Sequence, residues 1–183
     1  MCKSPPLAPR RPAAKRATPQ SKVAHPELTA TDYGLPEGTA FIDTFKKDHG
    51  FLSNFAKVPI EFEGEIYPSV EHAFQAAKTD VPAERATIQG LGNPLWARQR
   101  GKNVTLRPGW DAIRLEVMQR FLRAKFAIPK MADKLLATGD TPLYEGNWWD
   151  DRFWGTVDGK GDNHLGVLLM EIRTELRSVA SSG

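Results

Sequence analysis

The segment from Ser69 to Lys78, SVEHAFQAAK, carries side chains that could do acid–base chemistry. On a helix, Glu71, Gln75 and Lys78 follow one another at i, i+4 and i+7 and line one face. Glu71 falls in the first turn, where the helix dipole favours a carboxylate. An ionised carboxylate held in a pocket can act as a general base or a nucleophile. A capping glutamate on a solvated helix face would give the same pattern, and the motif alone favours that interpretation.

His72 stands next to Glu71 and therefore points to another face of the expected helix. This position favours a surface or partly packed histidine. No second ligand stands four residues later, so we expect no zinc site at His72.

A second candidate is the loop from Tyr144 to Gly155, which is followed by Gly159 to Gly166. The tryptophans of this loop could stack on nucleobases, and such stacking is worth roughly 1–3 kcal/mol per base. The glycines near Asn163 would let backbone N–H groups approach a phosphate at a helix N-terminus. The segment matches neither a P-loop nor a dinucleotide fingerprint, because no strand precedes it. The loop contains three tryptophans: Trp148, Trp149 and Trp154.

Four aspartates of this region raise the question of a calcium site: Asp150, Asp151, Asp158 and Asp162. The spacing of an EF-hand and its terminal glutamate are missing, so we expect no metal ion and no cofactor.

The segment Leu106 to Trp110 places a basic residue and a tryptophan at an expected helix start. Arg107 could pair with a phosphate, and Trp110 could stack on a base or a sugar. A surface arginine and a packed tryptophan explain the same residues. A hydrolase triad is not expected, because Cys2 is the only cysteine and no serine stands in a G-x-S-x-G elbow.

The charge of the chain is divided unevenly along its 183 residues. Residues 1–26 hold six basic residues and no acidic ones, so residues 27–183, with 19 basic and 22 acidic residues, carry a charge of −3. We expect a disordered, proline-rich basic tail over residues 1–38 and a single domain over residues 39–180. The tail would be solvated or would add weak, salt-sensitive attraction to a polyanion. No membrane span or secretory signal is apparent, which together with the single cysteine predicts a cytoplasmic protein.

The expected elements must bring these segments together. Alternation predicts a strand over residues 41–45 and a hairpin formed by residues 58–62 and 65–67. Helices are expected over residues 69–79, 83–91 and 94–100, from Pro108-Gly109 to Pro129, over residues 131–138, and from Asn163 onward. Ser69 can cap the first of these helices. The inner face of the last helix is expected at Leu165, Leu168, Leu169, Ile172 and Leu176. Residues 141–162 form a loop. The pattern predicts an α+β fold, a predominantly helical single domain with a small antiparallel sheet.

Seven motifs in order resemble the NADAR family, also called YbiA-like, over about residues 41–177. They are Phe51–Phe55, Tyr67–Lys78, Leu106–Trp110, Lys125–Phe126, Leu135–Asp140, Asp151–Gly155 and Gly161–Gly166. The resemblance implies a helix-rich α+β fold and N-glycosidase activity. Two substrate classes go with it: phosphoribosylated aminopyrimidine intermediates of riboflavin synthesis, and ADP-ribose attached to guanine in nucleosides or nucleic acid. One departure is Gly101-Lys102, where the family often has Gly-Arg; lysine lacks the bidentate fork of arginine.

The resemblance also implies roles for individual residues. By position in the motifs, Glu71, Trp110 and Asp151 match the family's catalytic residues. The expected substrate-binding residues are Asn54, Phe55, His72, Gln75, Lys78, Arg107, Trp154, Gly155, Gly161 and Asn163.

The resemblance favours a glycosidase, and the presence of both Glu71 and Asp151 agrees with it. Breaking a C–N glycosidic bond builds positive charge on the sugar, which a carboxylate stabilises. Which of Glu71 and Asp151 activates water stays open. The alternatives are a non-catalytic module that binds ADP-ribose or NAD-like nucleotides, and a nucleic-acid-binding protein that uses the basic tail. The sequence predicts no oligomeric state.

Overall fold

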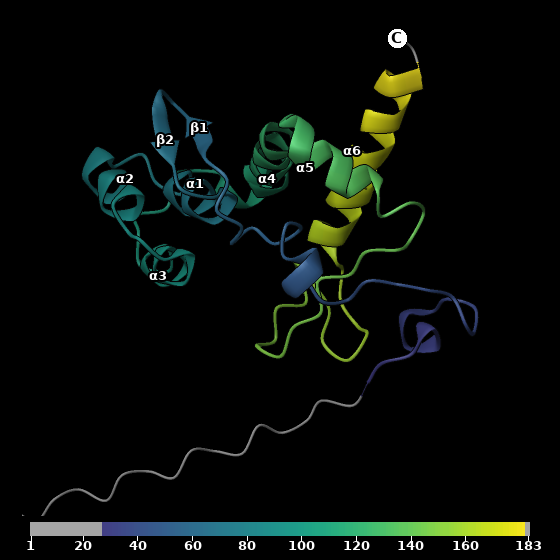
Figure 1. Cartoon of the computed structure of the whole chain (residues 1–183). Helices are drawn as coiled ribbons and strands as arrows, with labels where there is room; N and C mark the ends of the chain where they lie inside the picture. Colours follow the sequence, from purple (N-terminus) through teal and green to yellow (C-terminus); the bar gives the residue numbers. More distant parts are fainter. Residues whose placement is uncertain (1–26, 182–183) are drawn as a thin grey trace, which may run out of the picture.

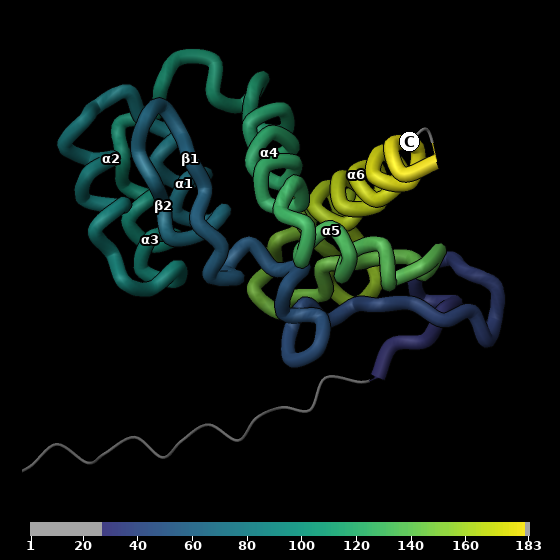
Figure 2. Tube along the Cα trace, turned by 45° about the horizontal axis from the view of Figure 1, so that its top comes forward, coloured from purple at the N-terminus to yellow at the C-terminus, as the bar shows by residue number. Residues whose placement is uncertain are grey.

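The computed structural model describes residues 27–181, which form two groups of elements (Figure 1). The hairpin lies with α1, α2 and α3 on one side, and α4, α5 and α6 lie on the other. The tube view in Figure 2 shows the same division. The elements are the 3₁₀ helices η1 (Ala30–Tyr33) and η2 (Lys47–His49), the strands β1 (Ile60–Phe62) and β2 (Glu65–Tyr67), and the helices α1 (Val70–Ala76), α2 (Pro82–Gln89), α3 (Pro94–Arg100), α4 (Trp110–Phe126), α5 (Pro129–Leu136) and α6 (His164–Ser181).

The predicted hairpin is confirmed: β1 and β2 pair antiparallel, with Ile60 opposite Tyr67. Glu63 and Gly64 link the strands with φ values of 51° and 83°. Two consecutive positive φ angles are what a tight hairpin turn requires, and glycine adopts them at little cost. The chain then enters α1, where the Ser69 hydroxyl accepts a hydrogen bond from the His72 N–H at 3.4 Å. This is the N-cap that the sequence predicts.

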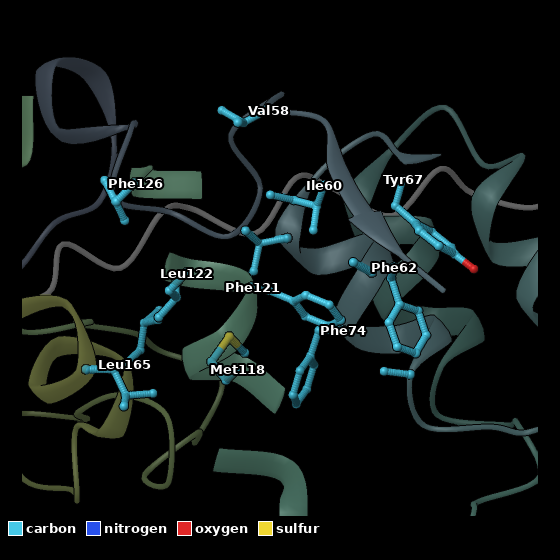
Figure 3. Close-up of a cluster of buried hydrophobic side chains, with 14 of the residues drawn as sticks. Val58, Ile60, Phe62, Tyr67, Phe74, Met118, Phe121, Leu122, Phe126 and Leu165 are labelled. Carbon is cyan, nitrogen blue, oxygen red and sulfur yellow. The ribbon is translucent and has the colours of Figure 1, made fainter. Parts of the chain in front are cut away.

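Helix α4 provides the centre of the core. Phe121 packs edge-on against Phe62 of β1, with 5.3 Å between the ring centroids. Figure 3 shows Phe121 and Met118 of α4 with the side chains of the hairpin and of Phe74 from α1. The inner face of α6, predicted from its leucine spacing, is buried at Leu165, Leu168, Leu169 and Ile172. The predicted helices and the α+β class are therefore confirmed, with helix ends displaced by a few residues.

The predicted strand over residues 41–45 is wrong. Ile42 makes a single parallel bridge with Leu143: the Tyr144 N–H donates to Ile42 O at 2.7 Å, and the Ile42 N–H donates to Pro142 O at 2.9 Å. A single bridge is too short to make a strand, because no neighbouring residues continue the pairing. The alternating pattern therefore reflects partial burial alone. This bridge ties the N-terminal segment to the loop before α6.

Residues 27–38 also differ from the expectation of a disordered tail. Residues 30–33 form η1, and Tyr33 stacks on Tyr144 with 4.2 Å between ring centroids. The Tyr33 hydroxyl also donates a hydrogen bond to Asp43 at 3.1 Å. These two contacts join the segment to other parts of the chain, which its composition does not reveal. The predicted tail over residues 1–26 lies outside the described residues. No helix within residues 27–181 is long and apolar enough to cross a membrane.

Candidate active site

A cavity of about 1530 Å³ lies where three parts of the chain meet. The N-terminal segment up to Ala56 forms one wall, one face of α1 and α3 forms the second, and the loop from Glu145 to Asp158 forms the third. Of the residues expected in the site, six line this cavity together: Asn54, Phe55, Glu71, Gln75, Asp151 and Trp154. Segments that are distant in the sequence thus converge on one space.

Glu71 is buried in the first turn of α1. Its backbone N–H donates to Asn54 O at 3.0 Å, and its Oε1 accepts a hydrogen bond from Gln75 Nε2 at 2.8 Å. Burial raises the pKa of the Glu71 carboxyl, and the Asp151 charge adds to this rise. The Gln75 amide and the charges of Arg98 and Lys78 act in the opposite direction and support the ionised form.

Asp151 is held by the loop that carries it. Its Oδ1 accepts the Trp154 N–H at 2.9 Å, and its own N–H donates to Asn147 Oδ1 at 3.0 Å. The Arg98 guanidinium lies 3.5 Å from Asp151 Oδ2. One backbone donor and one cation thus hold the Asp151 carboxyl in place. Arg98 thus links helix α3 to the loop across the cavity.

Asn54 reaches the cavity from the segment before β1. Lys125 of α4 holds this segment, because its buried Nζ donates to Ser53 O at 2.8 Å and to Leu52 O at 3.4 Å. Burial lowers the pKa of Lys125 to about 7. Asn54 Nδ2 lies 3.5 Å from Met118 Sδ, whereas the buried Asn54 Oδ1 has no hydrogen-bond partner among the described residues. Such an atom is costly to bury unless something pairs with it, so it is a candidate acceptor for a ligand hydroxyl.

An aromatic cluster borders the carboxylates. Phe74 and Trp154 line the cavity and meet edge-on, with 5.4 Å between their ring centroids. Trp110 does not line the cavity: it is buried behind Phe74 at 5.2 Å. Lys78 Nζ lies 5.7 Å from the Phe74 ring, and burial lowers the pKa of this amine. Trp110 and Lys78 therefore support the wall, while Trp154 is part of it.

Two expected binding residues are placed away from the cavity. His72 is buried, with Nδ1 2.8 Å from Ser69 Oγ and Nε2 2.9 Å from Leu91 O, so it braces α1 against the end of α2. Arg107 forms ion pairs with Asp80 and Glu63. Both side chains are paired within the protein and neither lines the cavity, so the structure gives the expected substrate contact no support.

The three remaining motif residues build the loop. Gly155 packs so closely on Glu145 that a Cβ atom would lie 2.1 Å from the Glu145 carbonyl oxygen. Gly161 has a φ of 151°, and a Cβ there would meet the Gly155 carbonyl oxygen at 2.3 Å. Asn163 donates to Leu143 O at 2.9 Å and accepts from the Glu145 N–H at 3.0 Å. These residues act on the loop backbone rather than on the cavity, against the expectation that they line it.

The sequence analysis missed Glu145 and Arg98, which both line the cavity. Burial raises the pKa of Glu145 to about 8, and the charges of Asp151 and Glu71 contribute to the rise. Arg98 could have been noticed, because it shares a helix face with Leu95 and Lys102 at i−3 and i+4. Glu145 gives no such signal, since its placement depends on the loop.

The rim of the cavity carries the tryptophan pair of the loop. Trp148 and Trp149 are exposed and meet edge-on, with 4.9 Å between their ring centroids. Lys46 Nζ lies 4.3 Å from the Trp148 ring, and the Arg98 guanidinium lies 4.9 Å from the Trp149 ring. Cations over aromatic faces suit a site for a planar base or a phosphate. Within residues 27–181, no group of three or more His, Cys, Asp or Glu side chains is placed to hold a metal ion.

Comparison with known proteins identifies the family. The family model described as NADAR domain matches residues 40–177. N-glycosidase YbiA of Shigella boydii is 40% identical over 133 residues, which cover 70% of this chain and 82% of that protein. The riboflavin biosynthesis protein VVA0006 of Vibrio vulnificus is 38% identical over 138 residues, which are 73% of this chain and 37% of that protein. The NMR structure of Escherichia coli YbiA matches with a TM-score of 0.68 and 34% identity, covering 79% of this chain and 92% of that one. The chain therefore belongs to the NADAR family.

Proposed function

We propose that this protein is a hydrolase that cleaves the C–N glycosidic bond of a nucleotide-type substrate. The observation that carries the proposal is the meeting of Glu71 and Asp151, from different parts of the chain, in one large cavity beside Trp154. The names of the relatives support the same class, since the Shigella protein is called an N-glycosidase.

Glu71 and Asp151 supply the negative charge that this reaction needs. When the C–N bond lengthens, positive charge develops on the sugar, and a fixed carboxylate in a partly dry cavity stabilises it. Glu71 activates the attacking water or stabilises the oxocarbenium-like sugar, and Asp151 assists it. Gln75 keeps the Glu71 carboxylate oriented through its 2.8 Å hydrogen bond.

Other groups of the cavity suit the rest of the substrate. The Asn54 Oδ1 atom can accept a hydrogen bond from a ribose hydroxyl. Arg98 can pair with a phosphate, and Trp154, Trp148 or Trp149 can stack on a base. A small-molecule site typically encloses roughly 300–1,000 Å³. The larger volume here, about 1530 Å³, leaves room for a diphosphate as well as a base.

Two substrate classes are proposed on separate grounds. ADP-ribosylated guanine, in nucleosides or in nucleic acid, suits the volume and the aromatic rim. Phosphoribosylated intermediates of riboflavin synthesis are suggested by the relative from Vibrio that is named a riboflavin biosynthesis protein. The alternative to an enzyme is a non-catalytic module that binds ADP-ribose or NAD-type nucleotides, which would use Arg98 and the tryptophans but not the charge of Glu71.

The test is hydrolysis of ADP-ribosyl-guanosine and of a phosphoribosylamino-pyrimidine by the wild type and by Glu71→Gln. The amide keeps the shape of the side chain and removes its charge, so we expect turnover of at least one substrate and a loss of about 10²–10⁴-fold in the variant. The exposed Glu116→Gln on α4 is the matched control and keeps wild-type turnover. Near-normal turnover by Glu71→Gln would refute the assigned role. Tight ADP-ribose binding without turnover of either substrate by the wild type would favour the binding module.

A further inference from the structure

Three contacts fix the backbone of Glu145 at the edge of the cavity. Its N–H donates to the Asn163 side chain at 3.0 Å, and its carbonyl accepts the Thr156 N–H at 2.8 Å. Gly155 lies directly against that carbonyl. On one side of Glu145, Tyr144 stacks on Tyr33, and on the other the Gly146 N–H donates to Asp43 O at 3.0 Å. Two of the family's motif residues, Gly155 and Asn163, thus converge on a residue outside those motifs.

The carboxyl of Glu145 has a different environment from the other two carboxyls of the cavity. Glu71 accepts a hydrogen bond from Gln75, and Asp151 accepts the Trp154 N–H and has Arg98 beside it. No hydrogen bond or ion pair of the described residues reaches the Glu145 carboxyl. A carboxyl that lines a cavity without a donor to pair with its charge is stabilised in its neutral form.

The charged groups that act on Glu145 come from three elements. Glu71 of α1 and Asp151 of the loop favour the protonated form, and Arg98 of α3 favours the ionised form. Burial is the largest influence, and together these raise the pKa of Glu145 to about 8. Burial raises the pKa of Glu71 as well, but Glu71 accepts a hydrogen bond from Gln75 and is supported by the charges of Arg98 and Lys78. The Glu145 carboxyl accepts no hydrogen bond from the described residues, so of the two it has less support for a negative charge. An acid and a base in one site need carboxyls whose surroundings differ in this way.

We propose that Glu145 is the general acid of the reaction, the group that gives a proton to the departing base. This inference rests on the proposed N-glycosidase function. In the step, the electron pair of the C–N bond goes to the base nitrogen, which takes the proton of Glu145. The oxygen of a water molecule bonds to the anomeric carbon, and the proton of that water goes to the carboxylate of Glu71. Transfer of one proton from Glu71 to solvent and of one from solvent to Glu145 restores the site, so one water is consumed.

The first test is the pH dependence of kcat for the wild type, Glu145→Gln and the control Glu116→Gln. A general acid must be protonated, so the wild-type and control rates fall as the pH rises through about 8. Glu145→Gln loses about 10²–10⁴-fold in kcat with little change in KM, and its residual rate lacks this alkaline decline. A rate within threefold of wild type, or a reduced rate that keeps the alkaline decline, overturns the proposal.

A second measurement needs no substrate. Infrared difference spectra between pH 6.5 and pH 9.5 report the carbonyl band of a protonated carboxyl. We expect a band that titrates near pH 8 in the wild type and in Glu116→Gln, and that is absent from Glu145→Gln. An unchanged titration in Glu145→Gln refutes the protonated state of Glu145. If the band behaves as expected while neither substrate is turned over, the proposed function fails instead.

Thermal unfolding separates this role from a structural one. The folded pKa of Glu145 lies above the ordinary value of 4.5, so its contribution to stability is complete below that pH and is lost as the pH rises through about 8. Glu145→Gln avoids this loss and should melt above the wild type at pH 9. A lower melting temperature at every pH would mean that the side chain supports the fold, and would contradict the proposal.

Discussion

Helix α1 and the loop between α5 and α6 each bring carboxyl groups to the same cavity, but different forces place them. On α1, Glu71 is positioned by a capped helix whose other faces are buried in the core at Val70, Ala73 and Phe74. In the loop, single contacts from side chains and glycines to the backbone position Glu145 and Asp151. In the helix many weak interactions together position Glu71, whereas in the loop a few residues position Glu145 and Asp151. We therefore expect substitutions that disturb the loop framework to cost more than the loss of the helix cap.

The largest effect is expected for Gly155→Ala. Its Cβ would lie 2.1 Å from the Glu145 carbonyl oxygen, a backbone atom that cannot move without the loop. We expect a cost of about 3 kcal/mol or more, a melting temperature lower by about 6 °C or more, and loss of activity. Gly92→Ala is the control, because a Cβ there meets no atom within 4 Å. Equal melting temperatures for the two variants would show that the loop backbone shifts to accommodate the extra methyl group, which would contradict the assigned role of Gly155.

An intermediate effect is expected for Asn163→Ala. The change leaves Leu143 O and the Glu145 N–H without their side-chain partner, at a cost of about 2 kcal/mol. Asn163 also has a φ of 52°, so Asn163→Gly should be measured beside it to separate backbone strain from the lost hydrogen bonds. Both variants should lose activity. Wild-type stability in both would contradict the assigned role of Asn163.

The smallest effect is expected for Ser69→Ala, which removes the cap of α1. The change removes the N-cap and the 2.8 Å contact of Ser69 Oγ with His72 Nδ1, at a cost of about 1–2 kcal/mol, which lowers the melting temperature by about 2–8 °C. The packing of α1 still holds Glu71, so kcat should stay within about twofold of wild type. A loss of activity as large as that of Asn163→Ala would mean that the helix depends on single contacts as the loop does.

The same contrast decides how much the sequence could predict. The hairpin at Glu63-Gly64, the cap at Ser69 and the face of α1 that carries Glu71 and Gln75 depend on local chemistry and periodicity, and each is found in the structure. The class of the fold follows from the same kind of pattern.

The role of the loop residues was not predictable in this way. The placement of Gly155 and Asn163 under Glu145 depends on contacts across the loop and into α6, which no local period reveals. Resemblance to the family marked both residues as important but assigned them to substrate. Trp110 is similar: its residue type suggested stacking on a ligand, whereas its neighbours bury it behind Phe74. Tertiary contacts decided these three cases.

The most direct test of the central claim, that helix and loop form one reactive centre, is a double-mutant cycle on kcat/KM. The variants are Glu71→Gln from α1, Asp151→Asn from the loop, and the two combined, with the preferred N-glycoside as substrate. Asp151→Asn keeps the oxygen that accepts the Trp154 N–H, so the loop can stay folded. Residues that act as a unit give losses that do not multiply. The account predicts that the double variant is hardly slower than the slower single variant. Losses that multiply, or near-normal turnover in either single variant, would contradict it.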